Sequence, residues 1–261
     1  QIWSLLLPLT HIAGINVLVR SMELGTVPID AREITGKYPF ADFTAVVPTQ
    51  LFRALNGDND LLEHLISAQA VLVGGAALSA ELREASHSAG INVIETYGMT
   101  ETCGGCVYDG TALESVEIEI RNGKICIKGP VLASSIPLID GWFESSDLGE
   151  FNNDQLVVIG RSDDVIISGG ENLSLSAVEN SLSLAFPDTQ FAAFAIEDSQ
   201  WGQSLQLAVV GTISNDQITA HLEKELGYFA KPKGIHRMTS LPLLGIGKID
   251  RKSLAKGIAN E

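Results

Sequence analysis

Apolar runs of strand length alternate with helix-like stretches through the first hundred residues, and this alternation limits the fold more than any other feature. The expected strands are 43–48, 70–74 and 91–96, and the expected helices begin near 51, near 60 and at 80. Ser79 is placed to cap the last of these helices, and Gly90 is placed to end it. Strands that are joined through helices pair in parallel, and ligands bind at the turns that follow such strands. We therefore predict a parallel sheet with a site at that edge.

The pattern changes after about Thr111, where short runs alternate apolar and polar residues. Asn122-Gly123 lies between two such runs and is the strongest hairpin signal in the chain. The expected hairpins pair 116–121 with 124–128, and 147–151 with 155–159. The segment 160–164 reads as a boundary, and a smaller α+β unit follows it. The predicted fold class is α/β: a large α/β domain with an antiparallel β subdomain, and a small C-terminal α+β domain.

The composition is that of a globular protein with an acidic surface. Hydrophobic residues make up 45% of the 261 residues, which is enough apolar material for a sizeable core. The net charge is −15, whereas binding to nucleic acid or to an anionic membrane surface needs a basic field, so we expect neither. The longest apolar run is broken by Pro8 and is shorter than the ~18 residues of a membrane span, so an integral membrane protein is not expected.

The start of the chain and its cysteines give two further expectations. The chain begins at Gln1 with no basic and apolar leader, so we expect no secretory signal and a natural beginning that is missing. Three cysteines make no disulfide framework and suit a reducing cytoplasm. Cys103 and Cys106 have the spacing of a zinc or redox pair, but no second pair of ligands follows at metal spacing. We expect the small residues around them to line a pocket wall.

Two polar clusters could carry chemistry. Tyr97, Thr100 and Glu101 follow a predicted strand, and they supply a ring for stacking, a hydroxyl for phosphate and a carboxylate for Mg²⁺. The alternative is a polar turn that has only a structural role. Lys248 ends the sequence Gly-Ile-Gly-Lys, which lacks the serine or threonine of a Walker loop, so it reads as a lysine on a flexible loop that can reach a ligand.

The remaining signals are weaker. His11 precedes a helix-like stretch that contains Arg20, and a lone histidine is more often structural than catalytic. No Gly-x-Ser-x-Gly elbow and no HExxH motif is present in the sequence, which removes the commonest hydrolase and metalloprotease readings. The basic segment from Lys231 onward is either a solvated face or a mobile cationic part that meets an anionic ligand.

Taken together and in this order, the motifs resemble those of the adenylate-forming acyl-CoA synthetase superfamily. The matching segments are LPLTHIAG (7–14), VLVGGAALS (71–79), ETYGMTET (95–102), GWFESSDLG (141–149), GRSDDVIISGGEN (160–172) and LPLLGIGKIDR (241–251). Segments 11–21 and 96–110 are most similar to the o-succinylbenzoate–CoA ligases of menaquinone biosynthesis, in their compact actinobacterial-type form. The resemblance implies a reaction in two steps. A small-molecule carboxylate and ATP give an acyl-adenylate and pyrophosphate, and the thiol of coenzyme A then displaces AMP.

The resemblance also implies a role for each matching residue. ATP and AMP binding falls to Gly74, Gly75, Tyr97, Gly98, Thr100, Asp147 and Arg161. The other implied roles are catalysis by Lys248, a hinge at Asp163, a Mg²⁺ ligand at Glu101, contacts to the acyl substrate from His11 and Arg20, and contacts to coenzyme A from Gly169 and Gly170. Within this scheme Asp147 accepts hydrogen bonds from both ribose hydroxyls, and Lys248 bridges the carboxylate and the α-phosphate. Arg20 faces the distal succinyl carboxylate.

Some features depart from the superfamily pattern and leave alternatives open. The phosphate loop that the family places before the His11 motif is not in this sequence, and Ser145-Ser146 replaces the usual Thr-Gly before Asp147. The implied domains are a large adenylation domain at 1–160, which lacks its N-terminal part, and a small mobile domain at 161–261. The alternatives are a ligase for another acyl or aryl acid, an adenylation domain that loads a carrier protein, and a non-catalytic adenylate-binding remnant.

Overall fold

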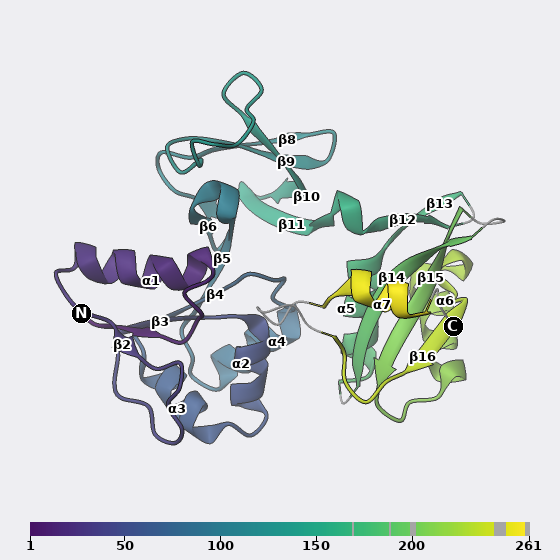
Figure 1. Cartoon of the computed structure of the whole chain (residues 1–261), viewed down its shortest axis with the longest axis horizontal. Coiled ribbons are helices and arrows are strands. Elements are labelled where there is room, and N and C mark those ends of the chain that lie inside the picture. The colour runs from purple at the N-terminus through teal and green to yellow at the C-terminus, as the bar shows by residue number, and fades with distance from the viewer. Residues whose placement is uncertain (169, 188, 199–201, 243–248, 259–261) are drawn as a thin grey trace. The chain divides into compact units, whose positions relative to one another are not determined.

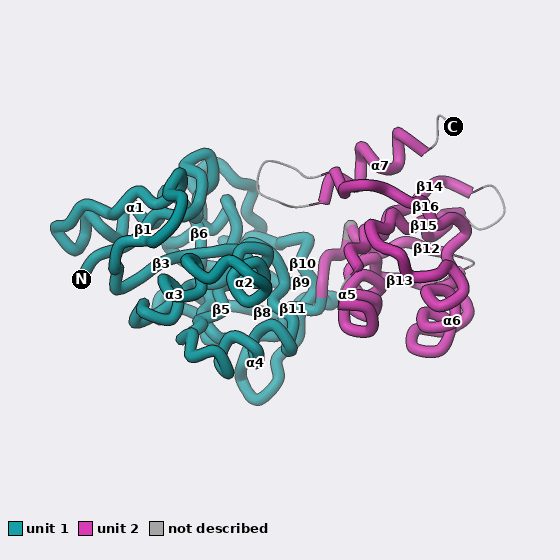
Figure 2. Tube along the Cα trace, turned by 90° about the horizontal axis from the view of Figure 1, so that it is seen from below, with its two compact units in different colours: residues 1–159 teal, residues 160–261 magenta. Residues whose placement is uncertain are grey.

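A seven-stranded sheet forms the centre of the first of two compact units, which comprise residues 1–159 and 160–261 (Figure 2). The computed structural model describes residues 1–168, 170–187, 189–198, 202–242 and 249–258. The strands of this sheet, in spatial order, are β2 (Ile29–Asp30), β1 (Trp3–Leu5), β3 (Phe43–Val46), β4 (Ala70–Gly74), β5 (Val93–Met99), β6 (Gly104–Tyr108) and β7 (Thr111–Ala112). Neighbours from β2 to β5 are parallel, and β6 and β7 are antiparallel additions at one side.

Helices cover both faces of this sheet (Figure 1). They are α1 (Ile12–Glu23), α2 (Pro48–Leu55), α3 (Asn59–Ser67) and α4 (Ala80–Ser88). On one face, Val17 of α1 packs with Trp3 and Leu5 in a buried cluster. On the other face, Leu51 and Leu61 of α2 and α3 are fully buried against the strands. The predicted α/β class is confirmed, and apolar side chains of the central strands β1, β3 and β4 are buried against the helices, as is usual in parallel sheets.

Local signals begin and end these elements where the sequence predicts. The Ser79 side chain accepts a hydrogen bond from the Leu82 backbone N–H at 3.2 Å and caps α4. Gly90 follows that helix with φ +86°, a conformation that favours glycine. The Asp58 side chain caps α3 in the same way, accepting from the Leu61 N–H at 3.1 Å. The predicted cap and end of α4 are therefore confirmed.

The predicted hairpins form a second, four-stranded antiparallel sheet. Its order is β11 (Gln155–Arg161), β10 (Phe143–Asn152), β9 (Lys124–Lys128) and β8 (Glu117–Arg121). Asn122 and Gly123 both have positive φ, 51° and 79°, so they form the type of two-residue turn that the Asn-Gly pair predicts. Ile125 and Ile127 of β9 are fully buried in the cluster that joins this sheet to β6.

The second unit is a smaller α+β fold. Its elements are β12 (Val165–Ser168), β13 (Glu171–Ser174), α5 (Leu175–Ala185), β14 (Gln190–Asp198), β15 (Gly202–Val210), α6 (Asn215–Leu226), β16 (Gly234–Arg237) and α7 (Arg251–Ile258). Helices α5 and α6 cover one face of its sheet, and α7 covers the other, where Leu254 is buried with Phe194 (Figure 2). Among the described residues, no helix is long and apolar enough to span a bilayer.

Candidate active site

The clearest polar contact at the predicted site joins Tyr97 and Asp147. Tyr97 lies toward the C-terminal end of β5, Asp147 lies in β10, and the Tyr97 hydroxyl donates to Asp147 Oδ2 at 2.9 Å. Asp147 is only 9% exposed. Burial, and next the charge of Asp147, raise the pKa of the Tyr97 phenol, so the phenol stays protonated and serves as a donor. Two predicted nucleotide-binding residues from separate sheets are thus brought together.

Ser145 fixes the backbone at Asp147. Its hydroxyl accepts from the Asp147 backbone N–H at 3.1 Å and donates to the Ile125 carbonyl at 2.8 Å, so it links β10 to β9. The hydroxyl is buried, and both of its bonds are therefore protected from water. Serine in place of the family's usual threonine retains this hydroxyl. The departure noted in the sequence therefore leaves the support of Asp147 intact.

The turn after β5 is organised by Thr102. Its hydroxyl accepts from the Met99 backbone N–H at 2.9 Å and donates to the Gly104 carbonyl at 2.7 Å. These bonds stabilise a short 3₁₀ turn over Thr100–Thr102. Thr100 is left exposed and Glu101 half-buried, so both are available to a ligand on the same turn.

Close packing explains two of the three glycines of the predicted nucleotide site, Gly74 and Gly98. Gly74 pairs with Thr96 across β4 and β5, and a side chain at Gly74 would overlap the Thr96 hydroxyl. A side chain at Gly98 would overlap the Gly104 carbonyl. Gly75 has φ +82°, and a Cβ there would meet only Val47 Cγ1, at 3.5 Å. The space beside Gly75 is therefore open at the C-terminal edge of two parallel strands, as a ligand site in such a sheet requires.

His11 and Arg20 lie at opposite ends of α1 and are not brought together. His11 is the N-cap residue, its side chain makes no capping bond, and its carbonyl accepts from Ile15 N–H at 3.1 Å. Arg20 Nη2 donates to the Tyr108 hydroxyl at 2.8 Å, and its guanidinium carbon lies 5.3 Å from the centre of the Trp3 ring. Within the described part of the chain, no carboxylate pairs with Arg20.

The other predicted site residues belong to the second unit or lie outside the described residues. Arg161 ends β11, and Asp163 is the middle residue of a 3₁₀ turn over Ser162–Asp164. Gly170 lies between β12 and β13 with φ +87°. Gly169 and Lys248 fall outside the described residues, so their roles stay predictions.

The residues present fit a nucleotide with its magnesium ion better than a metal centre made by protein alone. Glu101 is a single carboxylate on the turn after β5, beside the exposed hydroxyl of Thr100. The described residues include no group of three or more His, Cys, Asp or Glu that could hold a metal. Mg²⁺ is commonly held by one or two carboxylates together with substrate phosphates, so one glutamate is a sufficient protein ligand.

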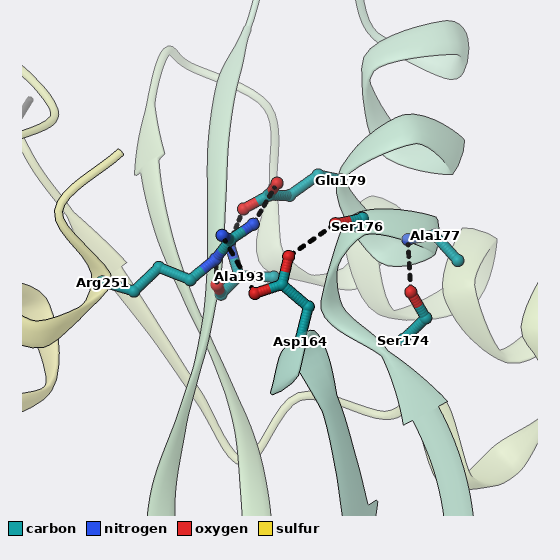
Figure 3. A network of polar contacts seen from close by, with 7 residues as sticks. All are labelled: Asp164, Ser174, Ser176, Ala177, Glu179, Ala193 and Arg251. Atoms are coloured by element: carbon teal, nitrogen blue, oxygen red, sulfur yellow. Dashed lines mark hydrogen bonds and ion pairs between the residues drawn. The ribbon is translucent and has the colours of Figure 1, made fainter. Parts of the chain in front are cut away.

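Sequence reasoning missed three residues that organise the site or its surroundings. Asn16 donates to the Cys103 carbonyl at 2.9 Å, and Tyr108 receives the Arg20 bond. In the second unit, Arg251 donates to Glu179 at 2.7 Å and to the Ala193 carbonyl at 2.9 Å (Figure 3). Each contact joins residues that are distant in sequence, so no local pattern signals it. All three residues lie in segments that resemble the superfamily, but such a segment does not by itself show which of its residues meet in space.

Comparison with known proteins assigns the chain to a family. The family of AMP-binding enzymes matches residues 1–135. A probable 2-succinylbenzoate–CoA ligase of Mycobacterium tuberculosis is 35% identical, and the match covers 99% of this chain and 75% of that protein. A solved o-succinylbenzoate CoA synthetase of Bacillus subtilis, in complex with the acyl-adenylate intermediate, is 26% identical with a TM-score of 0.80 over 97% of this chain and 60% of that one. The same synthetase in complex with ATP and magnesium ion is 26% identical with a TM-score of 0.81, over 97% of this chain and 61% of that one.

The predicted resemblance is confirmed by these matches, because the family covers more than half of the chain and the mycobacterial relative is aligned with nearly all of it. The chain spans about three fifths of the length of the two Bacillus structures. Its fold agrees with theirs. The chain belongs to the family of AMP-binding enzymes and, within it, to the 2-succinylbenzoate–CoA ligases.

Proposed function

We propose that this chain is an AMP-forming acid–thiol ligase that converts o-succinylbenzoate to o-succinylbenzoyl-CoA through an acyl-adenylate. The observation that carries the proposal is the 2.9 Å hydrogen bond between Tyr97 and Asp147. It brings together the segments 95–102 and 141–149 in the first unit. In the proposed scheme, Tyr97 of the first segment contacts adenine and Asp147 of the second contacts the ribose. Family membership supports the same class of reaction.

In the proposed first step, a carboxylate oxygen of the acid attacks the α-phosphorus of ATP, and pyrophosphate leaves. Asp147 accepts hydrogen bonds from the two ribose hydroxyls, because a carboxylate can receive both and the Tyr97 phenol as well. Thr100 donates its exposed hydroxyl to the α-phosphate. Lys248 supplies positive charge where negative charge develops in the transition state. Mg²⁺, which Glu101 would hold together with the nucleotide, would neutralise phosphate charge when bound.

In the proposed second step, the thiol sulfur of coenzyme A attacks the acyl carbon. A C–S bond forms, the C–O bond to AMP breaks, and the thiol proton is released. Gly169 and Gly170 edge the path of the pantetheine arm in this scheme, and Arg161 contacts the ribose. Asp163 is the hinge about which the small domain, residues 161–261, moves between the two steps. ATP, Mg²⁺ and coenzyme A are therefore the proposed reactants and cofactor.

The proposed substrate is a dicarboxylate because no acidic side chain among the described residues pairs with the charge of Arg20. Arg20 donates a hydrogen bond to the neutral phenol of Tyr108 and makes a cation–π contact with the indole of Trp3. A half-buried guanidinium is best satisfied by a carboxylate, which it can bind through two parallel bonds. The distal succinyl carboxylate supplies that group, and His11 faces the acyl moiety at the other end of α1. We place the reaction in the cytoplasm, where the three cysteines remain the free thiols that the structure shows.

The test is an ATP–pyrophosphate exchange assay with a panel of carboxylic acids, followed by detection of the CoA thioester by mass spectrometry. We expect exchange to be fastest with o-succinylbenzoate and to require Mg²⁺. A parallel titration with a non-hydrolysable analogue of o-succinylbenzoyl-adenylate measures ligand binding separately from catalysis.

Each alternative predicts a different result. Fastest exchange with another acid would indicate a ligase for that acyl or aryl group. Exchange without a CoA thioester would indicate a domain that loads a carrier protein. Binding of the analogue without any exchange would indicate a non-catalytic adenylate-binding protein.

A further inference from the structure

We propose that Tyr108 is a positioning residue that orients the Arg20 guanidinium toward the second carboxylate of the acyl substrate. Tyr108 would then set the preference for dicarboxylic over monocarboxylic acids without contacting the reacting atoms. The inference rests on the proposed function and deepens it, because it names a residue that determines the substrate class.

The two hydrogen bonds of the Tyr108 hydroxyl have a defined direction. Its oxygen accepts from Arg20 Nη2 at 2.8 Å, and its hydrogen is donated to the Gly105 carbonyl at 3.1 Å. A guanidinium can only donate and a carbonyl can only accept, so the phenol must act as the relay between them. One edge of the guanidinium is therefore held at a fixed place by β6.

The ring of Trp3 fixes a second side of the same guanidinium. The guanidinium carbon of Arg20 lies 5.3 Å from the ring centre, within the range of a cation–π contact. Trp3 is 6% exposed and packs against Phe43 at 5.1 Å between ring centres, so its position is set by the core. The Arg20 side chain therefore contacts aromatic residues of both β1 and β6.

The backbone around Tyr108 is shaped to allow this contact. A side chain at Gly105 would come within 2.9 Å of the Tyr108 hydroxyl oxygen. A side chain at Gly104 would overlap the amide of Asn16, which lies one turn before Arg20 on α1 and donates to the Cys103 carbonyl at 2.9 Å. The glycines after the Tyr97 motif thus let α1 approach the segment 103–108, where the sequence had suggested only a pocket wall.

The two partners of Arg20 among the described residues are neutral, and this feature points to an anionic ligand. A guanidinium has five N–H donors, of which Tyr108 receives one. In the part of the chain that the structure describes, no acidic side chain pairs with Arg20. A side chain that is fixed in place and lacks a protein counterion is preorganised for a ligand carboxylate, because little ordering remains to be done on binding.

The test is Tyr108→Phe, which removes the hydroxyl and keeps the ring. Calorimetric titrations use two non-hydrolysable acyl-adenylate analogues that differ only in the presence of the distal carboxylate. We expect the dicarboxylate analogue to bind about three- to tenfold more weakly and the monocarboxylate analogue to change by less than about twofold. In an Arg20→Ala background, Tyr108→Phe should have no further effect on either analogue, because the two residues act as one unit.

Tyr228→Phe is the matched control, because Tyr228 is 73% exposed in the second unit and loses the same hydroxyl. Equal weakening of both analogues by Tyr108→Phe, or additive effects of Tyr108→Phe and Arg20→Ala, would show a general structural role and overturn the inference. A wild-type preference for the dicarboxylate that is unchanged in Tyr108→Phe would overturn the inference alone. A wild-type chain that binds both analogues equally, or neither, would overturn the proposed substrate as well.

Discussion

The carboxylate of Asp147 is positioned by the protein before a ligand arrives. Ser145 holds its backbone N–H at 3.1 Å, and Tyr97 donates to its Oδ2 at 2.9 Å. An ionised carboxylate accepts about four hydrogen bonds, so it can serve the phenol and two ribose hydroxyls together. At the residue scale, the proposed nucleotide site therefore depends on an acceptor whose position is fixed by two different sheets.

Asp147→Asn tests this role of Asp147. Asparagine keeps one oxygen to accept from Tyr97, but it loses the charge and half of the oxygen acceptors. We expect AMP and acyl-adenylate analogues to bind about tenfold or more weakly, since a hydrogen bond to a charged group contributes about 1.5–3 kcal/mol. Calorimetric titration measures the change. Asp154→Asn is the control, because Asp154 lies in an exposed turn with φ 64°, where asparagine is well tolerated. Equal affinity of the two variants would contradict the assigned role.

His64 makes the first unit sensitive to acid. The ring is 3% exposed, and its Nε2 lies 2.8 Å from the Ser4 hydroxyl. Burial lowers the pKa of His64, so the folded protein holds the neutral ring while the unfolded chain takes up a proton near pH 6.5. The stability that depends on the neutral ring is therefore complete above that pH and is lost as the pH falls below it.

We expect the urea concentration at the unfolding midpoint to decrease as the pH is lowered from 7.5 to 5. This decrease should be smaller in His64→Phe. The phenylalanine variant cannot titrate at this position, so the difference between the two slopes isolates His64. The absolute stability of the variant is not the test, because it leaves the buried Ser4 hydroxyl without its partner. Identical slopes in both proteins would refute the assignment.

At the scale of the elements, Arg251 joins the start of α7 to three other parts of the second unit (Figure 3). It donates to Glu179 of α5 at 2.7 Å and to the Ala193 carbonyl of β14 at 2.9 Å, and it lies 3.5 Å from Asp164. Burial raises the pKa of Glu179 to about 7, although the charge of Arg251 acts in the opposite direction. The ionised form of Glu179 therefore depends strongly on its arginine.

Arg251→Ala should destabilise the second unit by about 2–3 kcal/mol, because it leaves two half-buried carboxylates without their cation. Arg251→Lys should restore only part of this loss, since lysine keeps the charge but lacks the planar fork that meets several acceptors. Chemical denaturation measures both variants against Lys252→Ala, which removes the next, exposed cation of α7. A loss in Arg251→Ala no larger than that in Lys252→Ala would show that the network contributes little.

The elements that the sequence predicts correctly are those with strong local signals. The Asn122-Gly123 hairpin and the capped helix α4 were predictable because turn and cap chemistry is local. Strand β6 was not predicted, because glycines and cysteines give it no strand pattern and its pairing with β5 supplies the order. Helix α7 lies in a segment that the sequence marks only as basic, because Leu254 is its single buried residue.

The candidate site shows the same division. Tyr97, Thr100, Glu101 and Asp147 could be named from motifs, since the resemblance implies a role for each of them. Tyr108 and Asn16 lie in matching segments too, but the resemblance implies no role for either. Their contacts arise where α1 packs beside β6, and Arg20 and Tyr108 are 88 positions apart in the sequence. Contacts between residues so far apart in the sequence leave no periodicity or spacing signal along the chain.

At the scale of the whole molecule, the chain consists of two units with separate hydrophobic cores. The first unit is built around Val71 and Ile125, and the second around Val178 and Leu207, all of them fully buried. Separate cores allow two units to move as bodies about a short connection with little loss of packing. The residues proposed for adenylation and thioester formation are divided between these units, and we therefore expect the connection to control which step proceeds.

Asp163→Pro tests this control, because Asp163 lies in the 3₁₀ turn that follows β11 at the start of the second unit. Proline fixes φ near −65°, so rotation of the backbone at this position is prevented. We expect acyl-adenylate formation to persist and thioester formation to fall by about tenfold or more, measured in separate half-reactions. Lys248→Ala should show the converse, with adenylation lowered by about 10²–10³-fold and thioester formation from supplied acyl-adenylate retained. Asp163→Ala separates the loss of the side chain from the locking of the backbone. Wild-type rates for both half-reactions in Asp163→Pro would show that the turn is not the hinge.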